Sequence, residues 1–278
     1  MTRTHSVETA PETTSAMLDV RGVQKIYSGH GRRVEAVRDL TFRIGQGELA
    51  CIVGPSGAGK TTLLKCIAGL LAPTSGEVRL GAGKVVGPPR DMAIVFQEYG
   101  RSLFPWMTVE ENIELPLKQK KVPKARRTEL VEKSLSAVGL QDASRAHPWQ
   151  LSGGMQQRVA IARAVAYEPS VLLMDEPFAA VDAQTRSELE DLTRSLWKRL
   201  GMTVLFVTHD IDEAVYLGQR VLVLSSSPTV VMDDIAIDLP DDRDQLQTRA
   251  LSRFAELRAH VYQRIQDAKT FHDSRTGS

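Results

Sequence analysis

Short, uninterrupted apolar runs recur along the chain. They fall at residues 49–53, 171–174, 203–208 and 221–224, with polar or glycine-containing stretches between them. A continuous run of this length is typical of a strand that is buried on both faces of a sheet. Helical patterns lie between these runs, so the sequence predicts an α/β fold.

Two further parts of the chain are patterned differently. Residues 17–23 and 34–44 have the composition of strands, and the second ends at a turn that contains Gly45 and Gly47. From about 108 to 166 the apolar residues recur with the period of a helix, and strand-like runs disappear. The pattern therefore predicts an N-terminal β subdomain and a helical subdomain inserted at about 108–166.

The two ends of the chain differ from the core. Residues 1–16 are rich in Thr, Ser, Glu and Pro, which favours a disordered tail. We expect 221–224 to be the last core strand. A helical extension is then expected over 241–278, where a helical pattern covers 246–265. Packing is the default role for that helix, and a regulatory role is the alternative.

Composition narrows the possible partners. The 278 residues are 42% hydrophobic and 25% charged, which is ordinary for a globular protein. The net charge of +1, from 35 basic and 34 acidic side chains, gives no electrostatic footprint for nucleic acid. No run approaches the roughly 18 apolar residues of a membrane helix, so any membrane role is expected to need a partner. Cys51 and Cys66 fall in apolar settings, and we expect reduced core thiols.

A phosphate-binding loop follows the first buried run. Residues 54–61, GPSGAGKT, match G-x-x-x-x-G-K-[ST] between a predicted strand and a predicted helix. Backbone N–H groups of such a loop surround phosphate oxygens at a helix N-terminus. We expect Lys60 to reach the β- and γ-phosphates of ATP, Thr61 to ligate Mg²⁺ and Thr62 to meet the α-phosphate. The remaining loop residues are Gly54, Pro55, Ser56, Gly57, Ala58 and Gly59.

Two acids follow the run at 171–174. Asp175 ends the predicted strand, where a P-loop ATPase has the acid that organises Mg²⁺. Glu176 comes next and is suited to act as general base on the attacking water. A carboxylate pair at a strand end would by itself be assigned to the solvent-exposed surface. Its occurrence together with the phosphate loop favours a catalytic role.

Residues 151–158, LSGGMQQR, lie between the loop and the two acids. With these three motifs in this order, the chain resembles the ATP-binding-cassette (ABC) ATPases. The resemblance implies an α/β fold with a P-loop NTPase (RecA-like) core, an N-terminal antiparallel β subdomain and the inserted α-helical subdomain. It assigns residues 17–240 to the nucleotide-binding domain.

The same resemblance adds three residues to the site. Tyr27 matches the aromatic residue that stacks on adenine, and Gln97 matches the glutamine that contacts Mg²⁺ and the attacking water. His209 matches the switch histidine, which contacts the γ-phosphate and the catalytic carboxylate. A strand tyrosine, a glutamine after a strand or a lone histidine carries little meaning by itself, so these assignments depend on the family.

A composite site is implied as well. Small residues that open a helix expose N–H groups to an anion. In the family, the segment matching Ser152, Gly153 and Gly154 closes over the γ-phosphate held by a second copy, in a head-to-tail dimer. Asp182 matches the loop between the two sites. The family pattern has Gly and Leu where this chain has Ala179 and Val181, and both changes are small and apolar.

A finer resemblance concerns the partner. Residues 95–106, VFQEYGRSLFPW, and 222–228, LVLSSSP, are similar to ATPase subunits of importers for nitrate, alkanesulfonates and taurine. This implies a peripheral protein on the cytoplasmic face of the inner membrane. Its partners would be integral membrane permease subunits, a second copy and, indirectly, an extracytoplasmic solute-binding protein.

Three alternatives have less support. A soluble cassette ATPase acting on nucleic acid or ribosomes usually carries tandem cassettes and a basic surface, which this chain lacks. An exporter subunit is often fused to membrane helices. A P-loop kinase would need neither LSGGMQQR nor the histidine.

Overall fold

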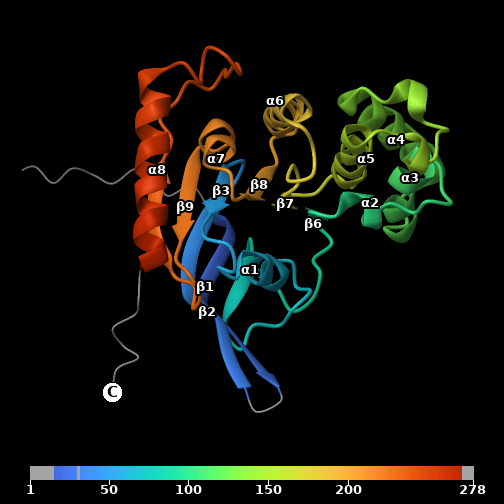
Figure 1. The fold of residues 1–278 in the computed structure, drawn as a ribbon. Coiled ribbons are helices and arrows are strands. Elements are labelled where there is room, and N and C mark those ends of the chain that lie inside the picture. The colour runs from blue at the N-terminus through green and yellow to red at the C-terminus, as the bar shows by residue number, and fades with distance from the viewer. Residues whose placement is uncertain (1–15, 30–31, 271–278) are drawn as a thin grey trace, which may run out of the picture.

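A six-stranded sheet forms the centre of the molecule. The structure is a computed structural model that describes residues 16–29 and 32–270 (Figure 1). The strand order is β10-β9-β3-β8-β7-β6, parallel except for β10, which is antiparallel to β9. The apolar runs of the sequence form its inner strands. The bounds are β3 Leu49–Val53, β6 Met92–Val95, β7 Val171–Asp175, β8 Thr203–Val207, β9 Arg220–Leu224 and β10 Val231–Ala236.

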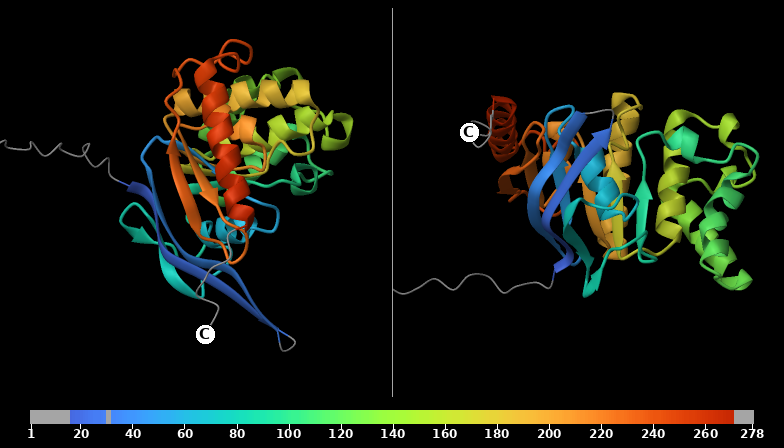
Figure 2. Two further views of the ribbon diagram at one scale, coloured as in Figure 1. Left: turned by 60° about the vertical axis from the view of Figure 1, so that its left-hand side comes forward. Right: turned by 90° about the horizontal axis from the view of Figure 1, so that it is seen from below.

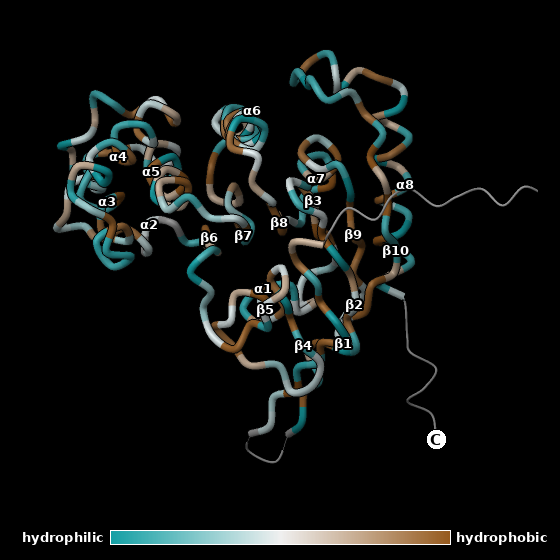
Figure 3. The backbone as a smooth tube through the Cα atoms, turned by 180° about the vertical axis from the view of Figure 1, so that it is seen from behind, coloured by the Kyte–Doolittle hydropathy of each residue, from teal (hydrophilic) through white to brown (hydrophobic). Residues whose placement is uncertain are grey.

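Both faces of this sheet are buried. Side chains alternate along a strand, so Cys51 and Val53 of β3 join one hydrophobic cluster, whereas Ala50 and Ile52 join the other. The first cluster includes helices α6 (Ala183–Leu200) and α7 (Ile211–Leu217), and the second includes α1 (Lys60–Ile67). Figure 3 shows the hydrophobic positions along β7, β8 and β9. Burial on both sides explains the uninterrupted apolar runs.

A second, antiparallel sheet covers α1. Its strand order is β2-β1-β4-β5. Leu18, Leu40 and Ile44 of this sheet pack in the same cluster as Leu63 and Ile67 of α1. The start of α1 therefore lies between the two sheets, close to β1. The bounds are β1 Ala16–Gly29, β2 Arg32–Gly45, β4 Ser75–Leu80 and β5 Gly83–Lys84.

A helical lobe separates β6 from β7 in the chain and stands to one side of the sheets (Figures 1 and 2). Helix α3 begins with a capping box, in which Thr108 accepts from the N–H of Glu111 and the Glu111 carboxylate accepts from the N–H of Thr108. The lobe ends in α5, which carries LSGGMQQR at its start. The lobe consists of α2 Tyr99–Ser102, α3 Val109–Gln119, α4 Lys124–Val138, short 3-10 turns at Gln141–Ala143 and Pro148–Gln150, and α5 Gly153–Ala166.

The C-terminal part differs from the expectation in two respects. The run 221–224 is not the last strand, because β10 pairs with β9 at the sheet edge. Only one of its six residues, Ile235, is buried, so β10 lacks a continuous apolar run. Helix α8 spans Ser252–Thr270 rather than 246–265, and it packs through Phe254 and Val261 on the cluster that contains α7.

The N-terminal boundary also differs. Ala16, which was assigned to the tail, is the first residue of β1, and residues 1–15 lie outside the described residues. Cys51 and Cys66 are free and buried, as expected. Among the described helices, none combines the length and apolar character required to cross a membrane.

Candidate nucleotide-binding and catalytic site

The loop between β3 and α1 has a shape that requires glycine. Gly59 has φ +71°, and a Cβ there would lie 2.6 Å from the carbonyl oxygen of Ala36. Thr229 secures the loop from the other side, because its hydroxyl donates to the carbonyls of Ala36 and Ala58. The loop is thus preformed at the N-terminus of α1, where backbone N–H groups attract anions.

Lys60 points back into this loop. Its side chain is 6% exposed, and Nζ donates to the carbonyls of Gly54 at 3.0 Å and Pro55 at 3.2 Å. Nζ also lies 3.7 Å from Oε1 of Glu176. Burial lowers the pKa of Lys60, whereas the neighbouring carboxylates of Glu176 and Asp175 act in the opposite direction. A cation is therefore held among the carbonyls where the predicted phosphates would lie.

Asp175 and Thr61 form an oxygen pair beside this lysine. Asp175 is the last residue of β7, and the Thr61 hydroxyl donates to its Oδ1 at 3.5 Å. Burial raises the pKa of Asp175, and the hydrogen bond from Thr61 opposes that rise. A hydroxyl and a carboxylate are hard oxygen ligands, and Mg²⁺ in such sites takes one or two of them together with phosphate oxygens and water. These residues fit Mg²⁺.

Glu176 has an unusual backbone conformation. Its φ is +43°, in the left-handed region that non-glycine residues rarely adopt, and its N–H donates to the carbonyl of Val207 at 2.8 Å. Its Oε2 lies 2.9 Å from Nδ1 of His209. Such a conformation persists only where the surroundings hold it and is common at functional sites. Lys60 and His209 thus approach the Glu176 carboxylate from two sides.

The loop after β8 holds His209 in place. The N–H of Asp210 donates to the hydroxyl of Thr208, and the Asp210 carboxylate accepts from the N–H of Glu213 as the N-cap of α7. Arg186 of α6 donates to the same carboxylate at 3.2 Å. The backbone on both sides of His209 is fixed, while the imidazole remains exposed.

Tyr27 and Gln97 lie at the edge of this cluster. Tyr27 is 43% exposed, and its hydroxyl lies 3.3 Å from that of Thr62. Gln97 lies two residues after the end of β6, where the parallel register pairs Val95 with Met174 of β7. Within the described part of the chain, no hydrogen bond joins the Gln97 side chain to the other candidate residues.

The segment from Ser152 to Gly154 lies at the start of α5. Ser152 caps the helix by accepting from the N–H of Met155 at 3.3 Å. A Cβ at Gly154 would lie 2.5 Å from Cγ2 of Thr185, so the glycine lets α5 begin against α6. Asp182 caps α6, accepting from the N–H and the hydroxyl of Thr185.

These two helix starts are separate from the phosphate loop. Among described residues, no hydrogen bond or ion pair connects 152–154 or Asp182 with 54–62. The backbone hydrogen bond from Thr185 is the largest cause that holds the pKa of Asp182 below its ordinary value. Ser152 and Asp182 thus cap two helices that meet at Gly154 and Thr185.

Comparison with known proteins identifies the family. The model described as ABC transporter matches residues 37–179. This chain belongs to the ABC transporter family. Its relatives include the nitrate import ATP-binding protein NrtD of Synechocystis sp., 44% identical over 84% of this chain and 86% of that protein. The taurine import ATP-binding protein TauB of Roseobacter denitrificans is 40% identical over 86% and 89%. The aliphatic sulfonates import ATP-binding protein SsuB of Bacillus cereus is 39% identical over 90% and 96%.

A solved ABC cassette has the same fold. The ATP-binding cassette MJ0796, a dimer in a post-hydrolysis state bound to ADP and Pi, superposes with a TM-score of 0.71 at 35% identity. The match covers 80% of this chain and 99% of that one. The expected fold class and the expected ATPase activity are therefore confirmed. The chain is an ATP-binding, ATP-hydrolysing cassette.

Three polar residues beside the site escaped the sequence analysis: Arg186, Glu213 and Thr229. The sequence around Glu213 could have indicated its burial, because this acid directly precedes the apolar segment 214–217 in a short helix. It is 4% exposed, and burial raises its pKa to about 8. The Thr208 hydroxyl opposes this rise, and the carboxylates of Glu190 and Asp210 add to it.

This pKa predicts a pH-dependent stability. Between its ordinary pKa of 4.5 and about 8, Glu213 holds its proton in the folded protein and loses it on unfolding. The folded state then binds more protons, so stability falls as pH rises through this window. Glu213→Gln removes the effect. The difference in unfolding free energy, variant minus wild type, should increase by on the order of 1–3 kcal/mol from about pH 5 to about pH 8. Urea titrations at the two pH values measure it.

Glu132→Gln on the exposed face of α4 is the matched control for removing a carboxylate. An equal difference for Glu213→Gln at both pH values would contradict the raised pKa.

Proposed function

We propose that this cassette powers uptake of a small anion or related solute of the nitrate, alkanesulfonate or taurine type. The names of its relatives support import, and their similarity extends over most of each chain. Two copies would bind integral membrane permease subunits at the cytoplasmic face of the inner membrane. An extracytoplasmic solute-binding protein would deliver the solute, which never contacts this chain.

The observation that carries the proposed chemistry is the convergence of Lys60 and His209 on Glu176. In this proposal, the loop 54–62 binds the phosphates, Lys60 neutralises their charge and Tyr27 stacks on adenine. Thr61 and Asp175 would hold Mg²⁺, and Gln97 would contact it and the attacking water. Bound Mg²⁺ supplies positive charge to the phosphate oxygens.

Glu176 acts as general base in this scheme. Its carboxylate takes a proton from the attacking water as the new bond to the γ-phosphorus forms and the bond to ADP breaks. His209 Nδ1 orients that carboxylate through Oε2, which leaves Nε2 to face the γ-phosphate. Lys60 Nζ lies 3.7 Å from Oε1 of the same carboxylate.

Ser152, Gly153 and Gly154 complete the site in a second copy. Their N–H groups open α5 and suit an anion, but in one chain they lie apart from the phosphate loop. A head-to-tail dimer would bring them over the γ-phosphate, with Asp182 between the two sites. ATP stabilises the closed dimer because it contacts both copies only in that state, and hydrolysis removes those contacts.

Glu176→Gln tests the general base. The variant should bind ATP, lower kcat by about 100-fold or more, and accumulate as an ATP-bound dimer. Phosphate release and light scattering with ATP measure the two effects. Glu132→Gln, an exposed change of the same kind on α4, should behave as wild type. Wild-type turnover in Glu176→Gln would refute the assignment.

Ser152→Arg tests the composite site. A long cation at the start of α5 should block closure by steric overlap with the second copy, while ATP binding to the monomer's own loop stays within about twofold of wild type. Ser195→Arg, at an exposed position in the middle of α6, is the control. A normal ATP-induced dimer of Ser152→Arg in light scattering would exclude this arrangement.

Growth tests the transport role. A deletion strain should lose growth on nitrate, taurine or an alkanesulfonate as sole nitrogen or sulfur source. Wild-type protein should restore that growth, and Glu176→Gln should not. Full growth of the deletion strain on all three would overturn the proposed cargo class.

A further inference from the structure

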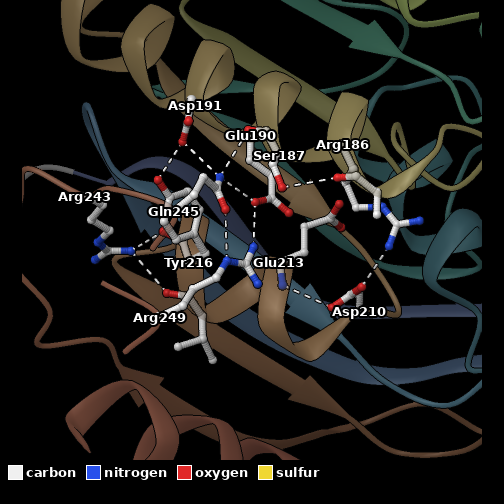
Figure 4. A network of polar contacts seen from close by, with 12 residues as sticks. Arg186, Ser187, Glu190, Asp191, Asp210, Glu213, Tyr216, Arg243, Gln245 and Arg249 are labelled. Atoms are coloured by element: carbon white, nitrogen blue, oxygen red, sulfur yellow. Dashed lines mark hydrogen bonds and ion pairs between the residues drawn. The ribbon is translucent and has the colours of Figure 1, made fainter. Parts of the chain in front are cut away.

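Buried carboxyl groups lie directly behind the His209 loop. Glu190 of α6 is 1% exposed and Glu213 of α7 is 4% exposed. Asp210 caps α7 beside them. Figure 4 shows these acids between the two helices. A buried carboxylate is costly unless a cation or hydrogen-bond donors compensate it, so something must stabilise this layer.

The segment before α8 supplies that compensation to Glu190. Arg249 Nη2 lies 2.7 Å from Oε2 of Glu190, and Arg249 Nε donates to Oε1 of Gln245 at 2.9 Å. The amide nitrogen of Gln245 lies within 3.1 Å of the Ser187 carbonyl and 2.9 Å of the carboxylates of Glu190 and Asp191. Two residues of the C-terminal segment thus balance and orient the acids of α6 (Figure 4).

The same segment holds α7. Arg243 donates to the carbonyls of Val215, Tyr216 and Gly218 at the C-terminal end of that helix. The Tyr216 hydroxyl donates to Asp191, and the Arg249 guanidinium lies 5.0 Å from the Tyr216 ring centroid. Side chains outside both helices therefore reinforce the direct hydrogen bond between α7 and α6.

A short path leads from this network to the catalytic pair. Arg186 of α6 bonds Asp210, the residue after His209. A cavity of about 10 Å³, about the size of one water molecule, is lined by Glu176, Arg186, His209 and Glu213 together with Phe178, Ala179, Thr208 and Asp210. Only this small cavity thus separates the start of α7 from the contact between His209 and Glu176.

We propose that Arg249 and Gln245 are positioning residues for ATP hydrolysis. They hold α6 and α7 so that the loop between β8 and α7 presents His209 to Glu176. The C-terminal segment therefore sets the turnover rate, although it touches neither nucleotide nor reacting atoms. This inference rests on the roles of Glu176 and His209 in the proposed function.

Arg249→Met tests the positioning role. Without the guanidinium, Glu190 is buried without its cation, and kcat per ATP-binding site should fall about 3- to 10-fold while KM for ATP stays within about twofold. Adding Glu190→Gln to this variant removes the uncompensated charge and should restore kcat. Arg253→Met is the matched control, because Arg253 pairs with Asp238 and Glu256 at the surface and should leave kcat unchanged.

A spectroscopic measurement separates positioning from packing. The ¹⁵N resonances of the His209 imidazole report its hydrogen bond to Glu176 and need no turnover. They should move in Arg249→Met and return with Glu190→Gln. Gln245→Leu provides the same measurements if Arg249→Met does not fold. Unmoved His209 resonances with wild-type kcat, or a kcat loss that Glu190→Gln does not restore, would overturn the proposal.

The same experiments distinguish a failure of the proposed function from a failure of the positioning role. If wild-type protein or Glu176→Gln violates the hydrolysis predictions, the proposed function fails. The His209 resonances still decide whether Arg249 positions the loop.

Discussion

The contact of the Glu176 carboxylate with Lys60 and His209 is the interaction around which the rest of the site is arranged. It joins three segments that are far apart in the sequence, each at the carboxyl end of a parallel strand or at the helix start that follows. Parallel strands bring their carboxyl ends to one edge, so the sheet order β3-β8-β7 makes the meeting possible. The strands themselves are apolar, so these three polar side chains lie at or beyond the carboxyl ends, where water and phosphate can reach them.

Sequence patterns predicted the interior better than the periphery. Strands such as β3 and β7 are buried on both faces, so their apolar runs were unambiguous. Edge strand β10 has mixed burial and left no such run. The start of α8 at Ser252 was also missed, because the residues before it form turns whose side chains satisfy α6 and α7 rather than a helix of their own.

The site divides in a similar way. Lys60, Thr61 and Asp175 could be predicted because a local motif requires particular residue types at fixed spacing. Arg186 and Arg249 have no local motif, since their partners lie on other elements. Tertiary ion pairs of this kind depend on the packing of helices, which one sequence does not reveal. The separation of Ser152 from the phosphate loop likewise became visible only once the helical lobe was placed beside the sheets.

The close approach of Gly154 to Thr185 links LSGGMQQR to the loop of Asp182, two segments that are separate in the sequence. The hydroxyl of Thr185 is bonded to Asp182, so its methyl group has no alternative position that keeps that bond. A methyl group added at residue 154 would have to rotate Thr185 or tilt α5. The helical lobe therefore packs closely on α6 at Gly154, because this residue has no β-carbon. Any change in the position of the lobe would therefore press on Thr185, which is bonded to Asp182.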